Sequence, residues 1–425
     1  MALWIIEIND TALSVWQDGM LAHTSPSIAL VEPRHVVTGS AAEARRHREP
    51  GLVHDRFWQQ LNELPLAGAT RRCRHHADLA YHHLHAVLEA VGRPREAVLA
   101  VPADYDGERL ALLLGIAGAL DLVVGGLVDA GTAALAAVAP AGSYTVATLY
   151  RHYATLADYV VGEQVERTAV RVCEPASRAR IEAAWADLVA DAFLDQARFD
   201  PLHAGASEQA LHDALPGWLA TADGATEIEL NLPLGGGNVG ARLDPRELAR
   251  VPAMVLAPLA EQLDPARQLV LEAGLAGMPG IAALFGGAPL LSADAVARGI
   301  ADRRLALGAG NAGGISFTTR LPAATAPGLA VVAMRDNAAV THLVAATGHA
   351  RAIGPPPLGL GGNGRFVTAA DAVALVSRAG GEAVASACRD GVLVNGTALT
   401  TPRALAAGDR VSLPGAAEFL AIRVD

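Results

Sequence analysis

The sequence has no lysine, few aromatic residues and only three cysteines, and each shortage excludes a kind of chemistry. All 33 basic residues are arginines, so no step can depend on a lysine ammonium group or a Schiff base. Cys73, Cys173 and Cys388 lie far apart and form no CxxC pair. This spacing disfavours a disulfide framework or a zinc ribbon, and it leads us to expect a reducing, cytoplasmic location.

Positive charge is also scarce. A net charge of −11 disfavours nucleic-acid binding, because phosphate recognition needs a cationic surface. The N-terminus has an acid at position 7 and no basic region of the kind that begins a signal peptide. A long apolar run, residues 110–128, is interrupted by Asp121 and by the pair Gly125-Gly126. It predicts a buried helix that leads into a buried strand, and hence no membrane insertion.

The order of the hydrophobic patterns predicts an α/β domain. Two strands joined by an Asn-Asp turn open the chain, Asp18-Gly19 is a hairpin signal, and a helical pattern over 73–92 precedes a buried strand at 97–105. Further helical patterns cover residues 177–220, 246–263 and 293–307, and further strand patterns cover 27–31, 35–38, 226–232 and 268–272. Such alternation is typical of a sheet covered by helices.

A glycine-rich segment, residues 308–314, predicts a linker, and we divide the chain into residues 1–310 and 311–425. The second part contains short apolar runs separated by turn signals such as Asn395-Gly396 and Gly408-Asp409. The runs lie at residues 329–334, 340–345, 392–394, 410–413 and 418–424. They predict a small all-β domain.

Four segments of the first part carry recognisable motifs. Residues 25–50 hold the pattern of an early hairpin, with Ser25-Pro26-Ser27, Gly39, Ala42 and Pro50. Residues 97–137 hold a strand that ends in Val-Pro-Ala, a turn to an arginine, a helix, a strand and an acid-led helix. Residues 269–285 hold a strand and a Gly-containing turn, and residues 290–307 hold a closing helix. In this order they resemble the nucleotide-binding domain of the heat-shock protein 70 (DnaK) family, in the actin/hexokinase superfold. The resemblance implies a two-lobed actin/DnaK-like ATPase fold, built on the ribonuclease H-like motif, over roughly residues 1–310.

That family grips ATP phosphates with two glycine-rich hairpins, and this chain departs from both. The first reads Asn9-Asp10-Thr11-Ala12, without glycine, and the second has Arg151 for an acid and Tyr153-Ala154-Thr155 for glycines. Side chains there would fill the space that the phosphates need. With no lysine for catalysis either, we expect no catalytic residue and no cofactor. The sequence thus predicts a pseudo-ATPase that binds other proteins, as a scaffold or assembly factor of a bacterial complex.

The alternative is a divergent ATPase or sugar-kinase relative that uses ATP and magnesium. Asp129 stands where the family has its catalytic glutamate and Asp158 where the second hairpin ends, so Asp10, Asp129 and Asp158 would then surround magnesium. Bound nucleotide would contact Asn9, Thr11 and Gly274. On this interpretation Asp129→Asn should abolish activity and leave the melting temperature nearly unchanged.

The end of the chain holds a second set of motifs, in residues 364–381 and 390–415. Val394-Asn395-Gly396, followed by Leu-x-x-Gly-Asp-x-Val-x-Leu at 405–413, resembles the ending of a forkhead-associated domain, a β-sandwich that reads phosphothreonine. The resemblance implies that Arg365, Ser377, Arg378 and Asn395 contact a phosphopeptide. The protein would then be a phosphothreonine-peptide adaptor, and the alternative is a plain interaction or structural module.

Four polar residues repeat along the predicted helix 73–92. His75, Asp78, His82 and His85 fall at i, i+3, i+7 and i+10, on one stripe. Imidazoles and a carboxylate can bind zinc, so the stripe is a candidate metal site. The alternative is a solvated helix face, because the apolar stripe lies on the opposite side.

Overall fold

The computed structural model describes residues 2–222, 225–234, 237–308, 315–324, 342–345, 350–353, 357–363, 365–379, 382–389, 391–395, 397–399, 402–405, 409–414 and 417–422. The chain forms two compact units, residues 1–330 and 331–425. The first is a mixed α/β domain and the second is all-β in its described residues, which confirms the predicted order of domain classes.

The first sheet of the first unit has the order β15-β8-β7-β1-β2-β3. Its strands are β1 (Trp4–Glu7), β2 (Ala12–Gln17), β3 (Met20–Pro26), β7 (Glu96–Val101), β8 (Val123–Asp129) and β15 (Phe317–Thr318). β1, β2 and β3 form an antiparallel meander, and β1, β7 and β8 run parallel. Asp18 and Gly19 both have positive φ, 49° and 83°, so the predicted hairpin turn between β2 and β3 is confirmed.

The second sheet has the order β14-β9-β10-β11-β16. Its strands are β9 (Gly142–Leu149), β10 (Ala154–Val161), β11 (Gln164–Cys173), β14 (Gln268–Leu271) and β16 (Arg320–Pro322). β9, β10 and β11 again form an antiparallel meander, and β14 pairs in parallel with β9. The two sheets therefore repeat one plan, in which the first strand of a meander pairs in parallel with a strand from later in the chain.

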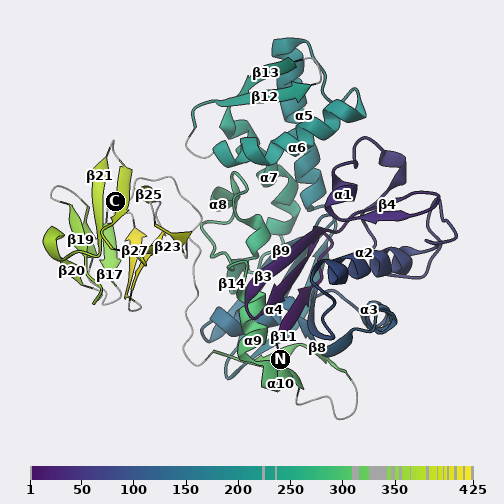
Figure 1. The fold of residues 1–425 in the computed structure, drawn as a ribbon, viewed down its shortest axis with the longest axis horizontal. Helices are drawn as coiled ribbons and strands as arrows, with labels where there is room; N and C mark the ends of the chain where they lie inside the picture. Colours follow the sequence, from purple (N-terminus) through teal and green to yellow (C-terminus); the bar gives the residue numbers. More distant parts are fainter. Residues whose placement is uncertain are drawn as a thin grey trace. The chain divides into compact units, whose positions relative to one another are not determined.

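Helices fill the space around and between the sheets (Figure 1). They are α2 (His76–Ala90), α3 (Gly107–Ala119), α4 (Ala130–Val138), α9 (Ala295–Asp302) and α10 (Arg304–Gly308). One apolar core contains residues of β1, β7, α4, β9, β10 and α9, so α4 and α9 join the two sheets. A Cβ on Gly299 of α9 would lie 1.8 Å from the carbonyl oxygen of Ala133, so this close helix contact requires glycine.

Residues 110–128 form most of α3 and then β8, so the predicted helix leading into a strand is confirmed. Among the helices of the described residues, none is both long and apolar enough to cross a lipid bilayer.

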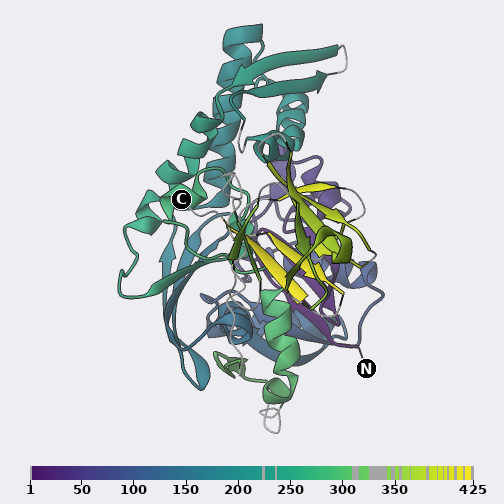
Figure 2. The same ribbon diagram turned by 90° about the vertical axis from the view of Figure 1, so that its left-hand side faces the viewer.

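Two further groups of elements extend the first unit beyond its sheets. A small sheet of β4 (Ala29–Val31), β5 (Val36–Thr38) and β6 (Val53–His54) is accompanied by α1 (Ser40–Glu43) and the 3-10 turn η1 (Pro50–Leu52). The second group consists of α5 (Arg178–Ala197), α6 (Gly205–Thr221), β12 (Ile228–Leu234), β13 (Gly237–Leu243) and α7 (Pro245–Ala260). The β12–β13 hairpin lies against α5 and α6 at the upper end of the unit in both views (Figure 1 and Figure 2). The turn η2 (Ala273–Leu275) and α8 (Ile281–Leu284) follow β14.

The second unit is a β-sandwich of a six-stranded sheet, β18-β17-β27-β26-β23-β24, and a five-stranded sheet, β20-β19-β21-β22-β25. The strands are β17 (His342–Ala345), β18 (Ala350–Ala352), β19 (Leu358–Leu360), β20 (Phe366–Val367), β21 (Ala374–Ala379), β22 (Glu382–Ala387), β23 (Leu393–Val394), β24 (Thr397–Ala398), β25 (Arg403–Leu405), β26 (Arg410–Leu413) and β27 (Ala417–Ile422), with the short turn η4 (Ala369–Asp371). Side chains of both sheets share one apolar core.

The predicted boundary at 310/311 falls inside the first unit. β15 pairs with β8 and β16 pairs with β11, so residues 315–324 complete both sheets of this unit. Apart from Gly308, the predicted linker 308–314 lies outside the described residues, as do the predicted strand 329–334 and the turn glycines at 396 and 408.

Candidate functional site

The hairpin tips of the two sheets meet where the resemblance places the phosphate grip. Asp10 follows β1, and its carboxyl oxygens accept hydrogen bonds from the backbone N–H groups of Arg151 (2.8 Å) and His152 (3.3 Å), in the turn between β9 and β10. Only 2% of Asp10 is exposed. Burial raises its pKa to about 7, although the charge of His152 and its N–H bond oppose the shift. Two backbone N–H groups of the β9–β10 hairpin thus donate to a side chain of the β1–β2 hairpin.

Two tyrosines fill the space beside this contact. The rings of Tyr150 and Tyr153 stack with 4.5 Å between their centroids, and both residues are buried. The Tyr153 hydroxyl donates to Asp104 (3.1 Å), which also pairs with Arg109 (3.0 Å).

Tyr150 lies among four acids. Burial raises its pKa well above the usual value, and the negative charges of Asp104, Asp10, Glu272 and Asp129 raise it further, in that order. Tyr150 therefore lies close to two of the three aspartates that the resemblance assigns to magnesium, Asp10 and Asp129.

The cavity that remains between the sheets is small. It measures about 50 Å³, and its walls include Asn9, Gly131, Tyr150, Tyr159 and Glu272. Sites for small-molecule ligands typically measure about 300–1,000 Å³. This space has room for a few water molecules and none for a nucleotide.

Two glutamates that the sequence analysis missed face the same cavity. Glu7 ends β1 and Glu272 follows β14, so equivalent strands of the two sheets bring the carboxyl groups together. Burial, and then the charge of Glu272, raise the pKa of Glu7 to about 7. Burial also raises the pKa of Glu272, although its carboxyl group accepts the N–H of Gly274 (2.9 Å). An acid that ends an otherwise apolar strand, as both do, was the available signal in the sequence.

Asp129 has a structural role. It is fully buried and caps α4, where one carboxyl oxygen accepts the N–H (2.6 Å) and the hydroxyl (2.7 Å) of Thr132. The same oxygen accepts the Tyr159 hydroxyl (2.9 Å), and the other accepts Arg167 (3.0 Å). A Cβ on Gly131 would lie 2.1 Å from that hydroxyl, so glycine makes room for it. All of these donors belong to the protein, so the structure leads us to expect a lower melting temperature for Asp129→Asn, where the sequence motifs predicted no change.

Asp158 lies away from the other two aspartates. Its neighbours in β10, Ala157 and Tyr159, line the cavity, so the alternation of a strand points Asp158 toward the opposite face of the sheet. There it accepts Thr145 (2.7 Å) and pairs with Arg171 (2.7 Å). Asp10, Asp129 and Asp158 therefore cannot surround one magnesium ion in this arrangement.

The residues predicted to touch nucleotide stabilise turns. The side-chain oxygen of Asn9 accepts the N–H of Thr11 (2.8 Å), and the backbone oxygen of Asn9 accepts the Ser27 hydroxyl (2.6 Å). Gly274 lies in η2, where its carbonyl accepts Arg178 (2.5 Å). Asn9 alone among Asn9, Thr11 and Gly274 lines the cavity.

The residues predicted to read phosphothreonine are divided between the two sheets of the second unit. Arg365 is exposed between β19 and β20, and Ser377 lies on β21, in the same sheet; the side chain of Arg378 lies outside the described residues. Asn395, in the β23–β24 turn of the other sheet, donates to Asp409 (2.7 Å) and accepts the N–H of Arg410 (2.8 Å). Its amide thereby fixes the turn to β26, and phosphopeptide binding stays a prediction.

The predicted metal stripe on α2 is wrong. Positions i and i+10 of a helix lie about 15 Å apart along its axis, too far for one ion. His75 accepts the N–H of Asp78 as the helix cap, His82 contacts the Arg72 carbonyl (3.3 Å), and His85 contacts Arg93 (2.9 Å). In the part of the chain that the structure describes, the metal-type group is a different one: His47, Glu208 and His212.

We predict that Asp129→Asn destabilises the first unit. The substitution replaces a buried, paired carboxylate with an amide that cannot accept from four donors, at a cost of about 3 kcal/mol. Urea unfolding followed by tryptophan fluorescence measures this cost, because all five tryptophans lie in the first unit. Asp195→Asn, at an exposed position of α5, is the matched control and should unfold as the wild type does. Equal midpoints for Asp129→Asn and wild type would contradict the structural role.

Glu7→Gln should change how stability depends on pH. Because the pKa of Glu7 is about 7 in the folded protein and near 4.5 when unfolded, its contribution is full below pH 4.5 and is lost as pH rises through 7. Glutamine resembles the protonated acid at every pH. As the pH rises from 5 to 8, the free energy of unfolding of the variant should therefore increase relative to that of the wild type by on the order of 2 kcal/mol.

The same fluorescence-monitored unfolding at the two pH values checks this result. Glu229→Gln, at an exposed position of β12, should show no such gain. If the difference in free energy of unfolding between Glu7→Gln and wild type is the same at pH 5 and pH 8, then the pKa of Glu7 is not raised.

Comparisons with known proteins do not assign the chain to a family. A scan against protein-family models gave no match, and a search of curated protein sequences gave none either. The resemblances to the DnaK family and to forkhead-associated domains therefore stay predictions, and the function is inferred from the residues described above.

Proposed function

We propose that the first unit is a degenerate actin/DnaK-like ATPase fold that does not hydrolyse ATP, and that the protein acts as a scaffold or assembly factor for other proteins of a bacterial cytoplasmic complex. The contact of Asp10 with the amides of Arg151 and His152 carries this proposal. In an active ATPase of this kind the hairpins hold phosphate with backbone N–H groups. Here those N–H groups donate to the carboxyl group of Asp10, which takes the place of the phosphate.

The repeated plan of the two sheets supports the proposed fold. In each, an antiparallel meander is extended in parallel from its first strand, and α4 lies between the sheets in a shared core. A duplicated sheet plan is what the ribonuclease H-like resemblance implies. The hairpins that meet at Asp10 are the first hairpins of the two copies.

The filled cleft supports the absence of hydrolysis. Hydrolysis requires phosphates, magnesium and water held together by preorganised groups. Here the stacked rings of Tyr150 and Tyr153 lie beside the contact between the two hairpins. Asp129 already accepts hydrogen bonds from four donors of the protein, and Asp158 points to the other face of its sheet. An active ATPase would have to expel both rings and break these bonds.

The surface formed by residues 59–64 and the start of α3 is the best candidate for partner binding. It is an open groove of about 730 Å³ lined by Leu64, Leu112, Asp106 and Arg109 among others. A second groove of about 400 Å³, between α2 and α3, shares Glu63 and Leu112 with it. Exposed apolar side chains with a charged rim are typical of protein–protein contact sites.

The two alternatives keep separate tests. A divergent ATPase predicts nucleotide binding in the first unit. A phosphothreonine adaptor predicts that Arg365→Ala abolishes binding of phosphorylated peptides and leaves their unphosphorylated forms unaffected, because an arginine fork holds phosphate. The exposure of Arg365 is compatible with that role.

Isothermal titration of the full-length protein with Mg-ATP tests the proposed lack of activity. We expect no binding heat at micromolar nucleotide and no phosphate release, because the cavity is too small for a triphosphate. An active DnaK-type ATPase under the same conditions is the positive control. Micromolar affinity together with turnover would overturn the proposal in favour of the divergent ATPase.

Capture of partners from the native host tests the groove. Leu64→Glu should remove proteins that the wild type retains, because a charge in the groove opposes apolar contact. Met254→Glu, on α7, is a matched control, since Leu64 and Met254 are each 67% exposed. Retention of the same partners by wild type and Leu64→Glu would place the binding surface elsewhere.

A further inference from the structure

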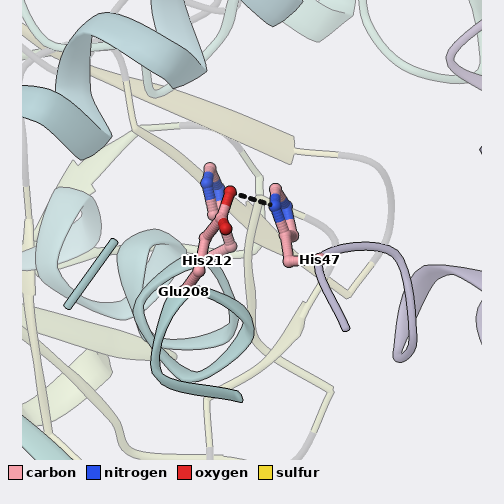
Figure 3. Close-up of side chains that lie close together, drawn as sticks. All are labelled: His47, Glu208 and His212. Atoms are coloured by element: carbon pink, nitrogen blue, oxygen red, sulfur yellow. Dashed lines mark hydrogen bonds and ion pairs between the residues drawn. The ribbon is translucent and has the colours of Figure 1, made fainter. Parts of the chain in front are cut away.

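Three potential metal ligands converge where the segment after α1 meets α6. Glu208 and His212 lie four residues apart on α6, and so on one face of that helix. His47 comes from the segment after α1, and its Nδ1 lies 2.8 Å from Oε1 of Glu208. The rings of His47 and His212 are nearly parallel, with centroids 3.8 Å apart (Figure 3). One ligand atom from each residue lies within 4.8 Å of the other two.

The backbone around these side chains is held firmly. The N–H of His47 donates to Gln209 (3.0 Å), whose side-chain amide donates to the carbonyl of Glu43 (3.2 Å). At the start of α6, a Cβ on Gly205 would lie 2.4 Å from the carbonyl oxygen of His47, so only glycine permits this approach. The chain therefore fixes both sides of the cluster before any ligand binds, as a preorganised site requires.

The chemistry of the three groups favours zinc over magnesium or calcium. Two imidazoles and one carboxylate suit Zn²⁺, while Mg²⁺ and Ca²⁺ prefer oxygen ligands alone. Each of the three residues is partly exposed, so an ion and a water molecule can reach the cluster.

The neighbouring charges do not oppose a cation. Arg46, which precedes His47 in the chain, is paired with Asp55 (2.8 Å) and Glu43 (3.8 Å). Glu182 of α5 lies close enough to interact with His47, and Asp213, next to His212, accepts a hydrogen bond from Gln209 (2.9 Å). Four carboxyl groups, those of Glu43, Asp55, Glu182 and Asp213, therefore lie near the cluster together with Arg46 and Arg178, which are themselves paired with carboxylates.

We propose that His47, Glu208 and His212 bind one Zn²⁺ ion, and that the ion fastens the segment after α1 to α6. The two imidazoles turn about their Cβ–Cγ bonds so that one nitrogen of each faces the ion, and Glu208 supplies one carboxylate oxygen. Three protein ligands leave a fourth position for water or for a side chain of a partner. The site bridges the two groups of elements that extend beyond the sheets, and it is independent of whether the first unit hydrolyses ATP.

Metal titration of the untagged, full-length protein after chelator treatment tests the site. Co²⁺ serves as the probe, because its visible absorption reports coordination by protein nitrogen, and Zn²⁺ is then added to displace it. We expect one equivalent of Zn²⁺ per chain, displacement of Co²⁺, and a higher melting temperature with Zn²⁺ than with chelator.

Glu208→Gln and His212→Gln should each weaken Zn²⁺ binding by at least about 100-fold, more than the loss of an outer-shell partner causes. His82→Ala, at a histidine of the rejected stripe on α2, is the matched control and should bind as wild type does. Melting curves in chelator show whether each variant is folded. If His212→Gln does not fold, the folded Glu208→Gln variant still tests the site. The proposal is overturned if wild type does not bind Zn²⁺ at micromolar concentration, or if the folded Glu208→Gln variant binds it equally well.

Discussion

The first unit depends on one contact between its two repeated sheets, in which Asp10 accepts the N–H groups of Arg151 and His152. A carboxyl group buried at such a junction is costly unless hydrogen-bond donors surround it, and here two backbone N–H groups donate to it. Once the hairpin tips are joined in this way, the space between the sheets closes. Tyr150 and Tyr153 complete the closure with ring stacking and a bond to Asp104.

The closure explains why the acidic residues of the cleft act structurally. Asp129 caps α4 and receives Tyr159 and Arg167, so its charge is used to hold α4 between the sheets. Glu7 and Glu272 face the small cavity, and burial raises the pKa of each, although the charge of Arg178 opposes the shift of Glu272. Ionised Glu7 and Glu272 therefore cost stability, whereas Asp129 contributes to it through its four donors.

On the proposed function, the closed cleft leaves the outer surfaces of the first unit for binding partners. The groove beside α3 and the His47–Glu208–His212 cluster both lie outside the junction between the sheets. A rigid centre suits this arrangement, because surfaces on either side then keep a fixed separation. If Zn²⁺ binds at the cluster, the same rigidity extends to α6 and the segment after α1. The all-β unit adds a separate surface, in which Asn395 stabilises a turn.

Local pattern by itself determined the elements and their order. The alternation of helices and strands, the hairpin at Asp18-Gly19 and the helix–strand step at residues 110–128 follow from hydrophobic spacing and from glycine, which act over a few residues. Under the proposed DnaK resemblance, Tyr153 at a position where that family has glycine likewise predicted that the phosphate position would be filled. The partners of the acids were decided by the tertiary structure.

The motifs placed both Asp129 and Asp158 at magnesium-binding positions. The alternation of side chains along β10, however, points Asp158 away from the cleft. The segment 315–324 joined the first unit because both sheets had edge strands free to pair with it. His47 and Glu208 are separated by 161 residues, so no pattern along the chain could bring them together, whereas the stripe on α2 was visible and too long for one ion. Periodicity reports on neighbours along the chain, and ligands and ion pairs depend on distances that only the packed chain sets.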